Sequence, residues 1–211
     1  MANFEKVSVA VFEGNLNNVV QLVKECIDNK IDPLDIINKG LIAGMSVVGQ
    51  RFKAGDMYVP EVLMAAKAMR AGVDVVKPLI AEGEIPNKGT IVIGTVKGDL
   101  HDIGKNLVGM MMESSGFQVI NLGVDISPER FAAAVKEHKP QVVGMSALLT
   151  TTMLAMKDTI EVLTEEGIRD SVKVIIGGAP VTADFAKEIG ADGFAPDAAS
   201  AAELAENLIN S

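Results

Sequence analysis

Apolar residues in the first part of the chain recur every three or four positions, which is the period of one helix face. Three such stripes, within residues 16–27, 34–52 and 62–80, follow a short apolar segment at 5–12. Asp32 followed by Pro33 predicts a helix start, because the carboxylate caps free amides and proline needs no hydrogen bond there. No strand is expected before residue 81. We predict four helices with short connections, packed as an antiparallel bundle.

From residue 90 on, short apolar runs alternate with stretches of helical period. The runs at 90–95, 119–122, 142–145, 174–176 and 193–195 suit strands buried on both faces, which are typical of parallel sheets. The predicted helices are 103–115, 128–137, 153–166, 183–189 and 198–209. The fold class is therefore α/β with an all-α N-terminal domain, a four-helix bundle followed by a Rossmann-like (flavodoxin-like) five-stranded parallel sheet. A polar linker at 81–88, with Gly83 and Pro86, predicts domains 1–83 and 84–211.

Composition excludes several classes of protein. With 211 residues, 48% of them hydrophobic, the chain is long and apolar enough to pack a core, so intrinsic disorder is excluded. A net charge of -9 argues against nucleic-acid binding, and 4% aromatic residues disfavour base stacking. One cysteine cannot form an internal disulfide. Neither an apolar run of membrane-spanning length nor a secretion signal is found, so no membrane contact and a cytoplasmic location are expected.

The unusual residues of the second half fall in three loops. In a sheet with strand order 2-1-3-4-5, ligands bind beyond the carboxyl ends of the strands, between the first and third strands. The segments 98–104, 146–150 and 177–180 each follow a predicted strand, so all three meet at this edge. The pair Gly177–Gly178 fits either a tight turn or a place where a ligand approaches the backbone. No phosphate-binding glycine pattern is found.

His101 is the candidate metal ligand in the first of these loops. A lone loop histidine is usually not a ligand, but Asp99 two residues earlier can hold one ring nitrogen and make the other more basic. A closed zinc site needs four nitrogen or sulfur ligands, and only Cys26 and His138 remain. We interpret His138 as a solvated residue at a helix end. A single protein ligand fits a metal that its own macrocycle already holds.

Three short motifs carry a family resemblance. Asp99-x-His101-x-x-Gly104, Ser146-x-Leu148 and Gly177–Gly178 follow one another at intervals of 41 residues (105–145) and 28 residues (149–176). Together they resemble the cobalamin-binding domain. Residues 55–63 resemble the helical cap module that precedes this domain in methionine synthase. The whole chain is still more similar to stand-alone corrinoid proteins of methyltransferase systems that act on methylamines, methanol, betaines or aryl methyl ethers.

The resemblance implies a cobalamin or related corrinoid, bound base-off with its nucleotide tail inside the Rossmann-like domain. His101 would be the lower axial ligand of cobalt, and Asp99 would tune its protonation; these two are the implied catalytic residues. In methionine synthase a serine completes this relay, and Thr152 stands in its place here. The implied cofactor-binding residues are Gly98, Asp99, His101, Asp102, Ile103, Gly104, Ser146, Leu148, Thr150, Thr152, Gly177 and Gly178. Tyr58, Val62 and Leu63 would cover the upper face of the corrinoid.

The implied function is that of a methyl carrier. A substrate-specific methyltransferase would place a methyl group on Co(I), and a second methyltransferase would move it from methyl-Co(III) to a folate or thiol acceptor. A reductive activase is a further implied partner, and turnover would occur only with these partners. The cap would have to move aside for each of them, which predicts a hinge in the 81–88 linker.

Three other functions share part of this pattern. An adenosylcobalamin mutase subunit shares the Asp-x-His-x-x-Gly domain, but such enzymes place a barrel over the cofactor, and none is present. A corrinoid-based sensor would need a DNA-binding region, and the acidic chain shows no basic recognition helix. A flavodoxin-like electron carrier leaves His101 and the motif spacing unexplained.

Overall fold

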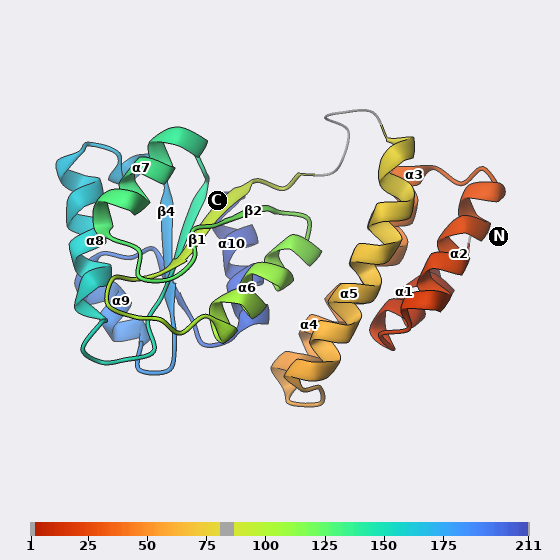
Figure 1. Cartoon of the computed structure of the whole chain (residues 1–211), viewed down its shortest axis with the longest axis horizontal. Helices are drawn as coiled ribbons and strands as arrows, with labels where there is room; N and C mark the ends of the chain where they lie inside the picture. The colour runs from red at the N-terminus through yellow and green to blue at the C-terminus, as the bar shows by residue number, and fades with distance from the viewer. Residues whose placement is uncertain (1–2, 81–86, 211) are drawn as a thin grey trace. The chain divides into compact units, whose positions relative to one another are not determined.

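The computed structural model of the chain describes residues 3–80 and 87–210. The chain forms two compact units whose main division falls between Asn87 and Lys88, one all-helical and one α/β (Figure 1). The predicted boundary at 83/84 and the predicted hinge lie in or next to residues 81–86, outside the described residues. None of the described helices is both long and apolar enough to cross a membrane.

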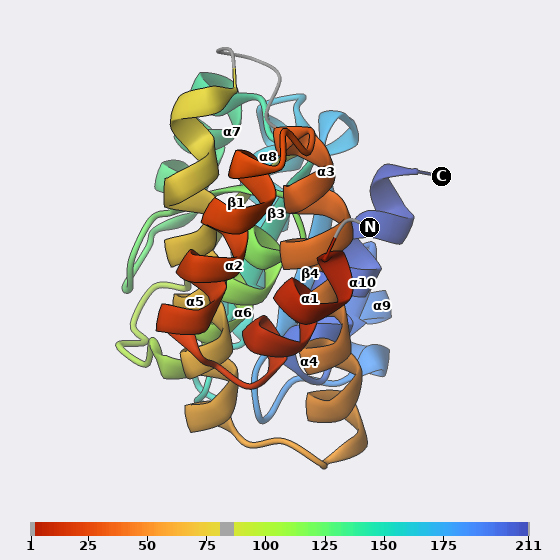
Figure 2. The same cartoon turned by 90° about the vertical axis from the view of Figure 1, so that its right-hand side faces the viewer.

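The first unit contains the four predicted helical rods (Figure 2). They are α1 (Phe4–Phe12), α2 (Leu16–Asp28), a continuous rod of α3 (Pro33–Asp35), η1 (Ile36–Ile42) and α4 (Ala43–Ala54), and α5 (Val59–Val76), which ends in the short 3-10 turn η2 (Lys77–Leu79). Asp32 caps the third rod as predicted, since its carboxylate accepts the amides of Leu34 and Asp35 at 2.8 and 3.2 Å. The apolar stripes meet in a core that includes Val19, Leu41 and Val62.

The middle of the third rod is π-helical, which the apolar period did not predict. Over Ile36–Ile42 the backbone bonds run one residue further than in an α-helix. Gly40 and Gly44 face α1 here: a Cβ on Gly40 would lie 3.0 Å from Val7 Cγ1, and one on Gly44 would lie 2.7 Å from the Ser8 carbonyl oxygen. The small residues of this rod therefore allow α1 to pack directly on its backbone.

The second unit is a five-stranded parallel sheet with the predicted order β2-β1-β3-β4-β5. Its strands are β1 (Thr90–Thr95), β2 (Gln118–Asn121), β3 (Val142–Ser146), β4 (Lys173–Gly177) and β5 (Gly193–Ala195), with each end within one residue of its predicted position. The helices are α6 (Ile103–Ser114), α7 (Pro128–His138), α8 (Leu154–Glu165), the 3-10 turn η3 (Arg169–Ser171), α9 (Ala183–Ile189) and α10 (Ala198–Ile209).

Helices cover both faces of the sheet, as its apolar strands require. Helices α7, α8 and α9 lie on one face and α6 and α10 on the other (Figure 1). On the first face, Phe131, Met156 and Leu163 pack with Val92 and Val143 in one continuous buried cluster. Burial on both faces fixes the strand register, and the register in turn decides which loops leave the sheet side by side.

Candidate functional site

The three loops predicted to meet do leave the sheet from neighbouring strands. Thr95, Ser146 and Gly177 end β1, β3 and β4, and they lie opposite one another in register. β1 pairs with β2 on one side and with β3 on the other. The direction in which successive strands are added to the sheet therefore reverses at β1. Such a switch point is the usual ligand site of an open α/β sheet.

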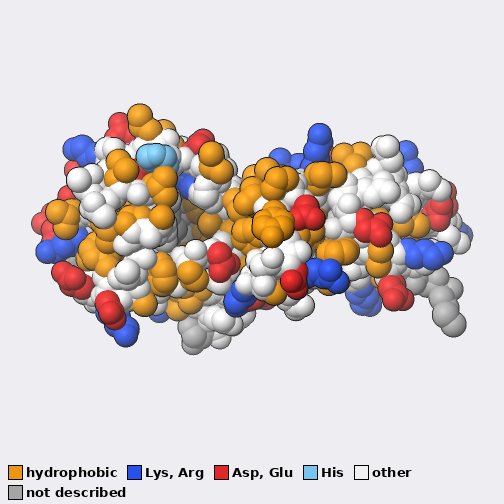
Figure 3. Space-filling model, turned by 90° about the horizontal axis from the view of Figure 1, so that it is seen from below, with side chains coloured by type: hydrophobic (Ala, Val, Ile, Leu, Met, Phe, Trp, Pro, Cys, Tyr) orange, Lys and Arg blue, Asp and Glu red, His pale blue; other side chains and the backbone are white. Residues whose placement is uncertain are grey.

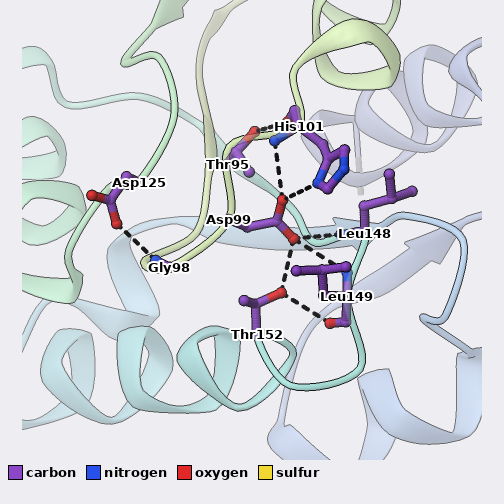
Figure 4. A network of polar contacts seen from close by, with 8 residues as sticks. All are labelled: Thr95, Gly98, Asp99, His101, Asp125, Leu148, Leu149 and Thr152. Carbon is purple, nitrogen blue, oxygen red and sulfur yellow. Dashed lines mark hydrogen bonds and ion pairs between the residues drawn. The ribbon is translucent and has the colours of Figure 1, made fainter.

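Asp99 is fully buried at this edge, and both of its carboxylate oxygens accept hydrogen bonds (Figure 4). Oδ2 accepts the amides of Leu148 at 2.7 Å and Leu149 at 3.2 Å and the Thr152 hydroxyl at 2.8 Å, while Oδ1 accepts the His101 amide at 3.1 Å. Burial by itself would raise the pKa of this carboxyl, but the hydrogen bonds from Leu148, His101 and Thr152 hold the pKa well below its usual range. Asp99 is therefore ionised at neutral pH.

The His101 imidazole is oriented by Asp99. Its Nδ1 lies 2.7 Å from Asp99 Oδ1, and its side chain is about half exposed, at 52%. An ionised carboxylate only accepts hydrogen bonds, so the shared proton belongs to Nδ1, and Nε2 of the neutral ring keeps its lone pair. The backbone is held as well, because the buried Thr95 hydroxyl donates to the His101 carbonyl at 2.8 Å. The ring thus presents a coordinating nitrogen in a fixed orientation.

Exposed apolar side chains gather in the segments that carry or contact His101 and Asp99. Within the described part of the α/β unit, the large apolar side chains that are exposed all belong to two segments, 100–103 and 148–154, which flank His101 and Asp99. They are Leu100, Ile103, Leu148, Leu149 and Leu154. Figure 3 shows hydrophobic side chains gathered on the surface of this unit, with a histidine next to them. Exposed apolar groups around a lone coordinating nitrogen fit a flat, largely apolar macrocycle that brings its own metal.

The other candidate metal ligands lie apart from His101. Across residues 3–80 and 87–210, no group of three or more His, Cys, Asp or Glu side chains could hold a metal ion. Cys26 is buried in the helical unit, and His138 ends α7, 3.7 Å from Glu137. His101 is therefore the ligand candidate for a metal that needs one protein ligand.

The glycines of the motifs have two different surroundings. A Cβ on Gly178, where φ is +125°, would lie 1.9 Å from the Ala147 carbonyl oxygen, and one on Gly177 would lie 2.9 Å from that of Ala195. These two glycines let the β3, β4 and β5 ends pack on one another, a reason that the sequence did not reveal. A Cβ on Gly104 would meet no atom within 4 Å. Gly104 therefore has open space around it, in the first turn of α6.

Asp102 is tied to the start of α6. It accepts the Asn106 side-chain amide at 3.0 Å, and Asn106 in turn accepts the Lys105 ammonium at 2.6 Å. Lys105 is buried, which lowers its pKa, while Asp102 acts to raise it, and it also donates to Asn121 at 2.8 Å. This network joins the loop after β1 to the end of β2. Its two asparagines and its lysine were not singled out from the sequence.

Other predicted residues are less constrained or lie elsewhere. Thr150 is exposed, and no hydrogen bond of its side chain is found among the described residues. Tyr58, Val62 and Leu63 belong to the helical unit at the start of α5: Tyr58 and Leu63 are exposed, whereas Val62 is buried in the bundle core. Met64, the next residue, is also exposed. The sequence analysis did not predict that Thr95 and Leu149 support the site. For Thr95 one signal was available, because it is a polar residue at the end of an apolar strand.

Family models match both halves of the chain. A B12 binding domain matches residues 89–205, and a second model, also described as a B12 binding domain, matches residues 4–77. A corrinoid protein of Desulfitobacterium hafniense is 44% identical over 214 residues, covering 99% of this chain and 98% of the relative. The dimethylamine corrinoid protein of Methanosarcina barkeri is 47% identical over 206 residues, covering 97% and 96%.

Solved structures agree. A chain in the crystal structure of the methanol:cobalamin methyltransferase complex of Methanosarcina barkeri matches with a TM-score of 0.86 and 36% identity, over 98% of this chain and 79% of that one. A cobalamin-binding protein of Desulfitobacterium hafniense matches with a TM-score of 0.85 and 32% identity, over 99% of both chains. With matches of this extent, the chain belongs to the family of corrinoid proteins built from a helical module and a B12 binding domain.

Proposed function

We propose that this protein carries methyl groups between two methyltransferases on a bound corrinoid. The observation that carries the proposal is the His101 imidazole, which is held at Nδ1 by buried Asp99 and is half exposed in a region with several exposed apolar side chains. The corrinoid cobalt would supply the chemistry of accepting and releasing the methyl group. The protein would supply the axial ligand, the orientation and the shielding from water.

His101 would ligate cobalt from below, and Asp99 would keep the imidazole in the ligating tautomer. Thr152 would keep the Asp99 carboxylate in place through its hydroxyl. The remaining predicted contacts would line the corrinoid and its tail: Gly98, Asp102, Ile103, Gly104, Ser146, Leu148, Thr150, Gly177 and Gly178. The exposed Tyr58 and Leu63 would cover the upper face, and Val62 would support them from the bundle core.

Relatives support methyltransferase partners. They include dimethylamine, trimethylamine and monomethylamine corrinoid proteins of Methanosarcina species, and a chain of a methanol:cobalamin methyltransferase complex. We infer that a substrate-specific methyltransferase loads this protein. A second methyltransferase with a folate or thiol acceptor would unload it, and a reductive activase would restore Co(I).

The test is the visible spectrum of the purified protein after incubation with hydroxocobalamin and removal of the free corrinoid. Wild type should retain one corrinoid per chain with the spectrum of a histidine ligand. His101→Ala should lose that signature, while His138→Ala, which removes the other histidine, should keep it. No retained corrinoid in the wild type, or equal spectra for wild type and His101→Ala, would overturn the proposal.

A further inference from the structure

Asp125 has a strained backbone that local structure does not explain. Three non-glycine residues among those described have positive φ: Lys30, Asp125 and Lys139. Lys30 and Lys139 follow the ends of α2 and α7, where left-handed residues commonly terminate helices. Asp125, at φ +55°, lies instead between β2 and α7 with no helix before it. A conformation unfavourable for an L-residue and held away from any helix end points to a local function.

Two hydrogen bonds join Asp125 to the loop that carries His101. Asp125 Oδ1 accepts the Gly98 amide at 2.7 Å, and the Asp125 amide donates to the Asp99 carbonyl at 3.0 Å. The next residue continues the connection, since the Ile126 amide donates to the Thr95 carbonyl at 2.9 Å. Asp125 therefore bonds through its side chain and its amide to two consecutive residues of the opposite loop.

The two aspartates hold this loop from opposite sides. Figure 4 shows Asp125 and His101 on either side of Asp99. The Asp99 carboxylate has to reach His101 and the amides of Leu148 and Leu149 at once, so the peptide that carries it can tolerate little rotation. The other hydrogen bonds between Asp99 and neighbouring segments are made by its side chain. From outside this loop, Asp125 holds the backbone at residues 98 and 99, while within the loop the Asp99 amide donates to the Val96 carbonyl at 3.1 Å.

We propose that Asp125 is a positioning residue for the cobalt ligand, which rests on the proposed function of His101. Its carboxylate fixes the Gly98–Asp99 backbone so that Asp99 contacts His101 and the loop after β3 together. Asp125 reaches the ligand through Asp99, whose carboxylate contacts the His101 ring.

Three substitutions separate conformation from hydrogen bonding. Asp125→Asn keeps a side-chain acceptor and tolerates the left-handed backbone. Asp125→Gly keeps the backbone conformation without strain and removes the acceptor, while Asp125→Ala loses both. The comparison of Asn with Gly therefore isolates the carboxyl oxygen, even where the alanine variant folds poorly.

Amide hydrogen exchange of the protein without corrinoid provides the first measurement. In Asp125→Gly we expect the Gly98 amide and also the Leu148 and Leu149 amides, which bond to Asp99 and not to Asp125, to exchange roughly tenfold faster. Asp125→Asn should restore wild-type rates at all three. Faster exchange at Gly98 alone, or equal rates in the Gly and Asn variants, would overturn the positioning role.

The spectrum with hydroxocobalamin gives the second measurement. Asp125→Gly should retain corrinoid but with a smaller fraction bound through histidine than Asp125→Asn. Equal fractions in the two variants would contradict the positioning role. Failure of wild type to retain corrinoid would instead reject the proposed function, while the exchange result would still decide whether Asp125 orients Asp99.

Discussion

Nδ1 of His101 and Oδ1 of Asp99 lie 2.7 Å apart, although the imidazole is half exposed and the carboxylate is fully buried. The contact thus joins a group at the protein surface to a rigid interior. Asp99 is fixed by donors from the loop after β3, so the orientation of His101 depends on residues about 50 positions away in sequence.

The Asp99 hydrogen bonds should make the stability of the protein fall in acid. A carboxyl whose pKa is lowered on folding stabilises the folded state above its unfolded pKa, about 3.8, and loses this contribution as pH falls below that value. The difference in unfolding free energy between wild type and Asp99→Asn should shrink as pH falls below 4. Urea unfolding across this range measures it, and a constant difference down to pH 3 would contradict the lowered pKa.

Thr152→Val should destabilise the protein by about 1–2 kcal/mol, because it removes the hydroxyl that donates to Asp99 and leaves a buried carboxylate with one donor fewer. Thr159→Val is the matched control: this threonine is also buried, but its hydroxyl donates to the Ala155 carbonyl of its own helix. The control should change the unfolding free energy far less. Equal losses in the two variants would indicate packing rather than the contact with Asp99. Thr152→Ser should recover most of the loss.

Gly178→Ala should be strongly destabilising, by several kcal/mol, because its Cβ would lie 1.9 Å from the Ala147 carbonyl oxygen at a φ of +125°. Gly167→Ala shares a positive φ, +69°, but its Cβ would meet no atom within 4 Å. That control isolates the backbone strain, which costs about 1–2 kcal/mol. Thermal unfolding of both variants makes the comparison, and similar Tm values would show that the ends of β3 and β4 can separate without loss.

Gly104→Ala distinguishes a binding role from a structural one. Gly104 lies in the first turn of α6 with open space around its Cα, so alanine should leave the folded state as stable or increase its stability by about 0.5 kcal/mol. Retention of hydroxocobalamin should nevertheless fall, because the added methyl group would fill open space that we propose the corrinoid occupies. Undiminished retention would place Gly104 away from the corrinoid.

The sequence predicted the α/β unit almost completely, for a physical reason. Strands such as Thr90–Thr95 are buried on both faces, and a continuous apolar run between turn residues has few other folded forms. The strand order 2-1-3-4-5 was expected for a flavodoxin-like fold, and this order places the loops after β1, β3 and β4 together. His101 and Asp99 could be paired in advance because they are only two residues apart.

Features that depend on contacts between distant segments could not be predicted. The π-helical stretch Ile36–Ile42 has an ordinary helical period, and its close packing on α1 is visible only in three dimensions. Gly177–Gly178 suggested a turn or a ligand approach, whereas the clash that excludes a Cβ on Gly178 comes from the chain around Ala147. Asp125 carries no local signal, because aspartate is common in loops and its partners lie 26 and 27 positions earlier.

All the groups that hold His101 belong to the chain itself. The Asp99 carboxylate holds its ring and the Thr95 hydroxyl holds its carbonyl. Backbone amides of the loop after β3 and the Thr152 hydroxyl in turn fix the Asp99 carboxylate. The conformational entropy of the ligating side chain is therefore lost during folding and not during capture of the cofactor. Corrinoid binding should accordingly proceed in a single phase whose rate rises linearly with corrinoid concentration. Loosening this support would slow capture and speed release even though no atom in contact with the corrinoid had changed.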